Sequence, residues 1–320
     1  MKLENIFEPV QNDLPQVTDT LMTVADVDFP QLSEIIKHVM SSLGKGVRPA
    51  LVLTAGKFSN YSLEKLVPMA AAAELLHVAS LVHDDAIDKS PLRRGLPTLH
   101  HLWGDGAATM AGDYLFAGSA ELAARPGNLR IVRLFAQTLM ALARGELQEG
   151  LTVYDPEQNR ESYFQRIGGK TAALFSMCTE SGAILSDAPE EHIQALKSYG
   201  MNLGLAFQVV DDILDFTGDE ATMGKPVGND LLQGIVTMPT ILYLEKNPGN
   251  DLLAQGFSSK NKAPLRQLVK QIRNSSAIAE SYEAAKDLVY KAKTSISPLP
   301  ENDSKGSLAT LADFVLERNK

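Results

Sequence analysis

Two short acidic runs in the sequence share one spacing, Asp-Asp-x-x-Asp. They occupy residues 84–88 and 211–215, and each follows a long apolar stretch. Their acidic members are Asp84, Asp85, Asp88, Asp211, Asp212 and Asp215. On a helix, residues four apart share a face, so the first and last aspartate of each run lie side by side.

Carboxylates gathered at the end of a buried helix repel one another unless a cation lies between them. Mg²⁺ prefers oxygen ligands and usually takes one or two carboxylates together with substrate phosphates. One such run has about even odds of being a solvated helix end, but two copies in matching context are much harder to dismiss. The pair therefore predicts two facing clusters that hold a diphosphate through Mg²⁺.

Cationic and polar residues suited to a diphosphate lie near these runs. Arginine suits bidentate phosphate contacts and lysine suits point-charge contacts. The candidates are Lys45, Arg48, Arg93, Arg94, Lys170, Thr171, Gln208 and Lys225. His77 lies seven residues before Asp84, on nearly the same helical face. It is either a core histidine or a neutral donor to phosphate, and His83 is a candidate partner of the cluster.

The periodicity of apolar residues is helical almost throughout, and strand signals are rare. The Asp155–Pro156 pair predicts a helix start. We expect an all-α, single-domain bundle over residues 1–320. The predicted helices cover residues 5–24, 30–42, 47–58, 62–88, 103–124, 127–149, 156–185, 189–219, 232–246, 262–273, 275–295 and 305–318.

The composition narrows the classes of function. The formal net charge of −9 argues against a nucleic-acid partner, because phosphate backbones need clustered Lys and Arg. The single cysteine, Cys178, allows no intrachain disulfide and fits a reducing compartment. No signal peptide is recognised, and the most apolar run, residues 66–82, is interrupted by polar residues. We expect a cytoplasmic protein without stable membrane insertion.

Several motifs together resemble those of the trans-isoprenyl diphosphate synthases (polyprenyl diphosphate synthases), over nearly the whole chain. Beside the acidic runs they are Gly44-Lys45-Gly46-Val47-Arg48-Pro49, Leu92-Arg93-Arg94-Gly95, Ala111-Gly112-Asp113, Gly145-Glu146, Gly169-Lys170-Thr171, Gly224-Lys225-Pro226 and Phe314-Val315-Leu316-Glu317-Arg318. The resemblance implies the isoprenoid synthase type I fold, with antiparallel helices around a central cavity, and a homodimer.

The resemblance also implies roles for single residues. Asp84, Asp88 and Asp211 are the main ligands of three Mg²⁺ ions, with Asp85, Asp212 and Asp215 close by. The allylic diphosphate binds Arg93, Lys170, Thr171, Gln208 and Lys225. Isopentenyl diphosphate binds Lys45, Arg48, His77 and Arg94. Many family members have an arginine where this chain has Gly46, and a glycine where it has Leu43. Because Lys45 and Arg48 remain, we expect this second substrate to bind.

The implied reaction joins the two substrates head to tail. The allylic C–O bond ionises, the double bond of isopentenyl diphosphate attacks the cation, and an apolar cavity excludes water. Catalysis is assigned to Asp84, Asp85, Asp88, Lys170, Asp211 and Asp212.

The length of the product depends on the helix before Asp84. Short-chain members of the family carry a bulky aromatic where this chain has Ala79 and Ser80. Small residues leave a tunnel open, and each helical turn adds about 5.4 Å of depth. We therefore expect a medium- to long-chain product of about thirty carbons or more, by extension of this depth. The chain-length candidates are Ala79, Ser80, Leu76 and Phe116.

Three alternatives stay open. A shorter-chain farnesyl or geranylgeranyl diphosphate synthase would share all the motifs. A class I terpene cyclase fits poorly, because Asp215 and Asp219 stand where its Ser/Thr and Glu would be. A non-catalytic prenyltransferase subunit typically lacks one aspartate cluster, whereas this chain keeps both.

Overall fold

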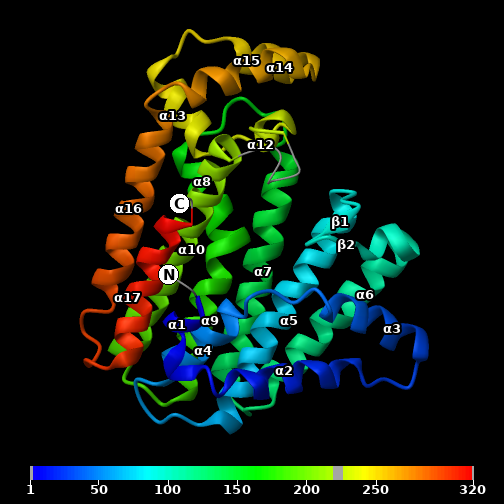
Figure 1. Cartoon of the computed structure of the whole chain (residues 1–320), viewed down its shortest axis with the longest axis vertical. Helices are drawn as coiled ribbons and strands as arrows, with labels where there is room; N and C mark the ends of the chain where they lie inside the picture. The colour runs from blue at the N-terminus through cyan, green and yellow to red at the C-terminus, as the bar shows by residue number, and fades with distance from the viewer. Residues whose placement is uncertain (1–2, 219–225, 319–320) are drawn as a thin grey trace. The chain divides into compact units, whose positions relative to one another are not determined.

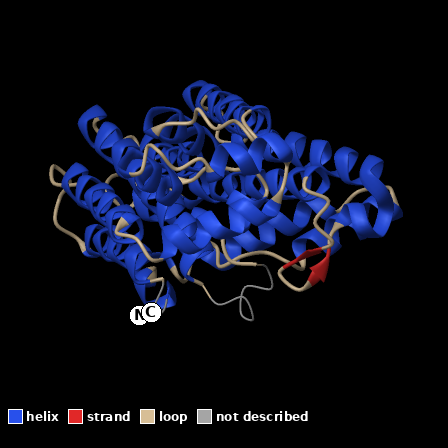
Figure 2. Cartoon of the chain, turned by 90° about the horizontal axis from the view of Figure 1, so that it is seen from above, coloured by secondary structure: helices blue, strands red, loops and turns tan. Residues whose placement is uncertain are grey.

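The structure, a computed structural model, describes residues 3–218 and 226–318. These residues form two compact units. The first unit holds the described residues of Met1–Gln137, Leu174–Lys197 and Pro298–Leu308. The second holds the described residues of Thr138–Ala173, Ser198–Ser297 and Ala309–Lys320. Each unit is helical, and Figure 2 shows a single short strand pair among the described residues. The predicted all-α fold is confirmed.

The first unit is built around the long helix α5. Its elements are α1 (Leu3–Ile6), η1 (Glu8–Val10), α2 (Leu14–Met22), η2 (Thr23–Ala25), α3 (Pro30–Met40), α4 (Val47–Gly56), α5 (Leu63–Ile87), β1 (Leu92–Arg93), β2 (Leu96–Pro97), α6 (Leu99–Ala124) and most of α9 (Ala173–Leu185). Helix α5 contacts α2, α4 and α6, and α5 and α6 run side by side in Figure 1. The four alanines Ala70–Ala73 are fully buried, and their small side chains allow this close packing.

Helix α5 is also long and apolar enough to cross a membrane. It is the one described helix that meets this test, and 72% of its most apolar window is buried in the structure. Burial of this kind is what the core helix of a folded domain shows.

The second unit contains the later helices. Its elements are the end of α7 (Leu129–Leu151), α8 (Arg160–Ile167), the π-helical turn η3 (Gly168–Ala172), most of α10 (Glu190–Thr217), α12 (Asn229–Leu232), α13 (Met238–Lys246), α14 (Leu252–Ser259), α15 (Lys262–Arg273), α16 (Ala277–Ser295) and the end of α17 (Asp303–Glu317). Helix α13 contacts α16, and α14 lies beside α15 in Figure 1.

Most of the predicted helices are confirmed, but four segments differ. The predicted helix 5–24 is broken into short pieces, with prolines at the starts of η1 and α2. Asp155 does not begin a helix. Instead Asn159 caps α8 in a reciprocal pair with Ser162, each side chain accepting from the other's backbone N–H at 3.0 Å. The helix predicted over 232–246 begins only at Met238, because Gly234 takes a positive φ of 90°. Helix α14 lies in a segment that was predicted to be a loop.

Candidate active site

The first aspartate cluster ends α5. Asp84 is half-buried and Asp88, at the C-cap, is exposed. The backbone N–H of Asp88 donates to the carbonyl of Asp84 at 2.8 Å, so the helical spacing holds to the end of the cluster. The two side chains therefore share one face, as predicted.

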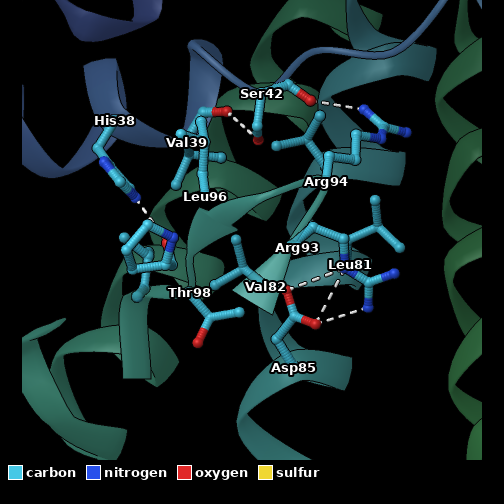
Figure 3. A pocket seen from close by; sticks show the side chains of 13 residues that line it. His38, Val39, Ser42, Leu81, Val82, Asp85, Arg93, Arg94, Leu96 and Thr98 are labelled. Atoms are coloured by element: carbon cyan, nitrogen blue, oxygen red, sulfur yellow. Dashed lines mark hydrogen bonds and ion pairs between the residues drawn. The ribbon is translucent and has the colours of Figure 1, made fainter. Parts of the chain in front are cut away.

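Asp85, between them, is buried and bound to Arg93 (Figure 3). Arg93 donates from Nε to Oδ1 at 3.0 Å and from Nη2 to Oδ1 at 2.6 Å. Burial lowers the pKa of Arg93, but the Asp85 carboxylate outweighs it and raises the pKa above its ordinary value. Asp85 thus holds a permanent cation beside Asp84 and Asp88, whose negative charges also act on Arg93.

A tight hairpin delivers Arg93 and Arg94. Arg93 pairs with Leu96 across β1 and β2, and the two turn residues Arg94 and Gly95 have φ of 52° and 81°. Two successive positive φ values are typical of a type I′ turn, which is uncommon for arginine at the first position. The turn sends Arg94 toward the loop before α4, where Nη1 donates to the carbonyl of Ser42 at 2.5 Å.

The loop before α4 carries Lys45 and Arg48. A Cβ built on Gly44 would lie 2.9 Å from Nη2 of Arg94, so this arginine packs directly on the loop backbone. Lys45 is exposed, and Gly46 has a φ of 65° with nothing within 4 Å of a built Cβ. The left-handed backbone explains the glycine at the position where many family members carry arginine.

His77 belongs to the same neighbourhood. Burial lowers its pKa well below the ordinary value, and the charges of Arg48 and Arg94 lower it further. The imidazole is therefore neutral at physiological pH and can donate one hydrogen bond to an anion. The structure brings together in the first unit four residues that were predicted to bind isopentenyl diphosphate, Lys45, Arg48, His77 and Arg94.

His83 faces α6 rather than the aspartates. Its Nε2 lies 3.1 Å from the carbonyl of Thr109 and 3.5 Å from Oδ1 of Asp113. A Cβ on Gly112 would lie 2.2 Å from this nitrogen, so the glycine makes room for the ring. Phe116 packs edge-on against the same ring at 5.1 Å. The Ala-Gly-Asp motif of α6 therefore anchors the end of α5.

The chain-length candidates lie on α5, except Phe116, which lies on α6. Ala79 and Leu76 are fully buried, and the half-buried Ser80 donates its hydroxyl to the carbonyl of His77 at 2.8 Å. Through its contact with His83, Phe116 lies beside the first aspartate cluster. Their control of product length stays a prediction.

The second cluster lies on α10, in the second unit. Asp212 is buried and accepts hydrogen bonds from the Tyr163 hydroxyl at 2.6 Å and from Nε2 of Gln208 at 2.9 Å. Burial raises the pKa of Asp212 to about 8, although both hydrogen bonds oppose this shift. Asp215 is also buried and accepts from the backbone N–H of Asp230 at 3.2 Å. The carboxylates of Asp212 and Asp215 therefore bind neighbouring groups of the protein. Asp211 is only half-buried.

Gln208 continues this network. Its Oε1 accepts from the hydroxyl of Thr171 at 2.7 Å, so Thr171, Gln208, Asp212 and Tyr163 form one hydrogen-bonded chain. The chain ties η3 and α8 to α10. It joins Thr171 and Gln208, both predicted to bind the allylic diphosphate, to Asp212 of the second cluster and to Tyr163, which no sequence motif marks.

Lys170 is held by two glutamates of α7. Its Nζ lies 2.5 Å from Oε1 of Glu149 and 2.9 Å from Oε2 of Glu146. Burial lowers the pKa of Lys170, but the two carboxylates outweigh it and raise the pKa above its ordinary value. The lysine is a fixed cation that is 30% exposed and open to a further anion.

Close backbone contact sets the position of Lys170. A Cβ on Gly145 would lie 2.3 Å from the backbone nitrogen of Lys170, and one on Gly169 would lie 2.8 Å from the carbonyl of Ala141. Helix α7 and the turn η3 therefore touch where both carry glycine. The π-helical form of η3 is of a kind frequent at functional sites.

The C-terminal Arg318 reaches the second cluster. Its Nη1 lies 3.0 Å from Oδ1 of Asp211, and its guanidinium covers the ring of Phe207 at 4.2 Å. The sequence contained this arginine in a family motif but gave it no role. Lys225, a predicted ligand of the allylic diphosphate, lies outside the described residues.

The donor set fits Mg²⁺ shared with a substrate. Among the described residues no group of three or more His, Cys, Asp and Glu side chains could hold a metal ion alone. Mg²⁺ rarely needs such a cage, because it keeps waters and takes one or two carboxylates plus phosphate oxygens. Asp84 and Asp88 offer two carboxylates at the end of α5, and Asp211 offers one on α10, which matches the one or two that Mg²⁺ takes.

Aspartate clusters on long helices beside fixed cations are typical of a class, the helical enzymes that bind a diphosphate substrate through Mg²⁺. Residues 29–274 match the sequence model of the polyprenyl synthetase family. Heptaprenyl diphosphate synthase component 2 of Geobacillus stearothermophilus is 37% identical, covering 100% of both chains. Solanesyl diphosphate synthase 2, chloroplastic, of Arabidopsis thaliana is 33% identical over 99% of this chain and 78% of its own length.

Solved structures of similar proteins match the fold of this protein over its whole chain. A decaprenyl diphosphate synthase from Rhodobacter capsulatus superposes with a TM-score of 0.93 at 32% identity, covering 100% of both chains. A polyprenyl synthase from Caulobacter crescentus CB15, complexed with calcium and isoprenyl diphosphate, gives 0.92 at 29% identity, covering 100% of this chain and 98% of its own.

The chain belongs to the polyprenyl synthetase family. It is a prenyltransferase with the isoprenoid synthase type I fold, and the predicted medium- to long-chain class is confirmed by these relatives. The shorter-chain and non-catalytic alternatives are not favoured.

Proposed function

We propose that this enzyme condenses isopentenyl diphosphate with an allylic diphosphate, head to tail. The observation that supports it most is that each aspartate cluster is bonded to a residue suited to a diphosphate: Arg93 to Asp85 in the first unit, and Gln208 to Asp212 in the second. A diphosphate held through Mg²⁺ needs carboxylates and cations of this kind. The two units then act as one catalytic domain, residues 1–320.

The chain's own residues supply binding, orientation and charge. Arg93, Lys170, Thr171 and Gln208, with Lys225, bind the allylic diphosphate as its C–O bond breaks. Lys45, Arg48, His77 and Arg94 hold isopentenyl diphosphate so that its double bond forms the new C–C bond. The released diphosphate takes the proton lost from the condensed product. When bound, Mg²⁺ supplies electrostatic stabilisation of the leaving diphosphate, held by Asp84, Asp88 and Asp211.

Turnover with isopentenyl diphosphate, an allylic primer and Mg²⁺ tests this function. Wild type should extend the primer to a medium- or long-chain all-trans product, sized by chromatography. Asp84→Ala should lower turnover by at least about a hundredfold, as for loss of a key electrostatic stabiliser. Asp19→Ala, an exposed aspartate of α2, is the matched control and should leave turnover unchanged. Near-normal turnover in Asp84→Ala would count against the proposal.

We also propose that the enzyme works as a cytoplasmic homodimer. Met140, Leu147 and Leu151 are 72%, 67% and 83% exposed and share one face of α7 at spacings of seven and four. An apolar helix face of this kind is typical of an interface, and a second copy of the chain would cover it.

The name of the Geobacillus relative, a component, favours a second candidate, in which a different subunit covers this face. Light scattering and turnover on the purified chain separate the two. An active dimer supports the homodimer, whereas an inactive monomer supports a two-component enzyme.

A further inference from the structure

Glu74 is a buried carboxylate outside both aspartate clusters. It lies in the middle of α5, ten residues before Asp84, and is only 4% exposed. Its Oε2 is buried and has no hydrogen-bond partner among the described residues. A buried carboxylate is costly unless a cation or donor compensates it, so its position calls for a reason.

Arg48 of α4 is a cation that can compensate this carboxylate. Its guanidinium lies over the ring of Phe175 at 5.2 Å, and its Nε is buried without a hydrogen-bond partner among the described residues. Burial lowers the pKa of Arg48, and the charge of Glu74 raises it. Burial raises the pKa of Glu74, and Arg48 lowers it. Each group therefore lies within the field of the other.

The same carboxylate acts on the rest of the cationic group. Arg94 also lowers the pKa of Glu74, and Arg94 and Arg48 repel each other. His77 lies three residues after Glu74 on α5, within the fields of Arg48 and Arg94. Arg48 and Arg94, both assigned to isopentenyl diphosphate, thus lie within the field of one carboxylate that has no role in that assignment.

Two arginines held together without a counter-ion would separate or leave the buried position. The carboxylate offsets their repulsion and lets the guanidinium of Arg48 stay over the Phe175 ring. We propose that Glu74 is a positioning residue, which holds Arg48 and Arg94 in the arrangement that receives the diphosphate of isopentenyl diphosphate. The inference rests on the proposed function.

The direction in which the affinity for isopentenyl diphosphate changes in Glu74 variants separates a positioning role from a purely electrostatic one. If Glu74 acted only through its field, removing its charge would strengthen the binding of an anion at this site. If it positions the arginines, removing it weakens binding. Glu74→Asp adds a second test, because it keeps the negative charge but shortens the side chain by one methylene group.

The experiment is titration calorimetry of isopentenyl diphosphate into wild type, Glu74→Gln and Glu74→Asp, together with steady-state KM values for both substrates. We expect both variants to weaken isopentenyl diphosphate binding by about tenfold or more. The KM for the allylic substrate and kcat at saturation should change little.

Glu180→Gln is the matched control, since Glu180 is 6% exposed on α9 and lies 3.3 Å from Lys197, apart from this group. It should bind isopentenyl diphosphate like wild type. If circular dichroism shows that Glu74→Gln does not fold, the binding measured for Glu74→Asp tests the inference. Unchanged or tighter binding in a folded Glu74 variant overturns the inference. A wild type that neither binds nor turns over isopentenyl diphosphate overturns the proposed function instead.

Discussion

The hydroxyl of Tyr163 donates a 2.6 Å hydrogen bond to Oδ2 of Asp212, and both side chains are buried. Burial raises the pKa of Tyr163 well above its ordinary value, and the neighbouring carboxylate raises it further, so the phenol remains a donor. The pair fixes Asp212 toward α8. Because Asp211 immediately precedes Asp212 on α10, this anchor also fixes the direction in which Asp211 points.

Tyr163→Phe should therefore destabilise the protein. Removal of the hydroxyl leaves the buried Asp212 short of one donor, at a cost of about 1–3 kcal/mol. For a chain of this size, the melting temperature should fall by several degrees, roughly 2–4 °C per kcal/mol. Tyr290→Phe removes a hydroxyl from a residue that is 71% exposed on α16, and it should leave the melting temperature unchanged. Equal melting temperatures for the two variants would contradict the role of the pair.

Gly145 and Gly150, five residues apart on α7, should respond oppositely to alanine. At Gly145 the new Cβ would lie 2.3 Å from the backbone of Lys170, so α7 and η3 must separate and displace the lysine. Gly145→Ala should lower the melting temperature and raise the KM for the allylic substrate. At Gly150 nothing lies within 4 Å, and alanine should stabilise the helix by about 0.5–1 kcal/mol. Thermal melts and KM values check both, and a neutral Gly145→Ala would refute the close contact.

Arg318→Gln should tighten the binding of a divalent ion. The arginine and a metal ion both need Asp211, so removing the cation frees that carboxylate. The two side chains are 29% and 35% exposed, and an ion pair of this kind contributes about 0.2–1 kcal/mol. We expect the apparent Kd for Mn²⁺, followed by electron paramagnetic resonance with diphosphate present, to fall by about two- to fivefold.

The matched control for Arg318 is Lys293→Gln. Lys293 of α16 pairs at 2.7 Å with Asp313 of α17, the helix that ends just before Arg318. It should leave the Kd for Mn²⁺ unchanged. Weaker Mn²⁺ binding in Arg318→Gln would mean that the arginine supports the metal site rather than competing with it.

Cys178 should be inert in the folded protein. It is fully buried, and burial raises the pKa of its thiol to about 12, so almost no thiolate exists at pH 8. A thiol reagent such as dithionitrobenzoate should report no reaction with native enzyme at pH 8 and one equivalent after unfolding in guanidinium. Rapid reaction of native protein would show that the packing of α9 around Arg48 is open.

The sequence predicted well what periodicity and paired motifs determine. The helix predicted at 62–88 is α5, Leu63–Ile87, because a long apolar run that contains Pro68 only near its start ends in the first cluster. Asp85 is bonded to Arg93 in the first unit, and Gln208 to Thr171 in the second, so residues of neighbouring motifs meet in each unit. Roles of single residues at that diphosphate stay predictions.

Other features depend on contacts that no local pattern encodes. Asp155–Pro156 has the composition of a helix start, but the Asn159–Ser162 pair satisfies the exposed N–H groups better four residues later. Tyr163, Glu149 and Arg318 act through partners on other segments, so nothing in their own neighbourhood marks them. Gly145 looks like a weak point of a helix until the backbone of Lys170 is seen against it.

The convergence of the two aspartate clusters on one diphosphate is the central claim. A crystal structure of the enzyme with Mg²⁺ and a non-hydrolysable allylic diphosphate tests it most directly. We predict Mg²⁺ ions at about 2.0–2.1 Å from carboxylate oxygens of Asp84, Asp88 and Asp211, bridged by the same diphosphate. Diphosphate bound at one cluster alone, with the other cluster far from any ion, would contradict the account.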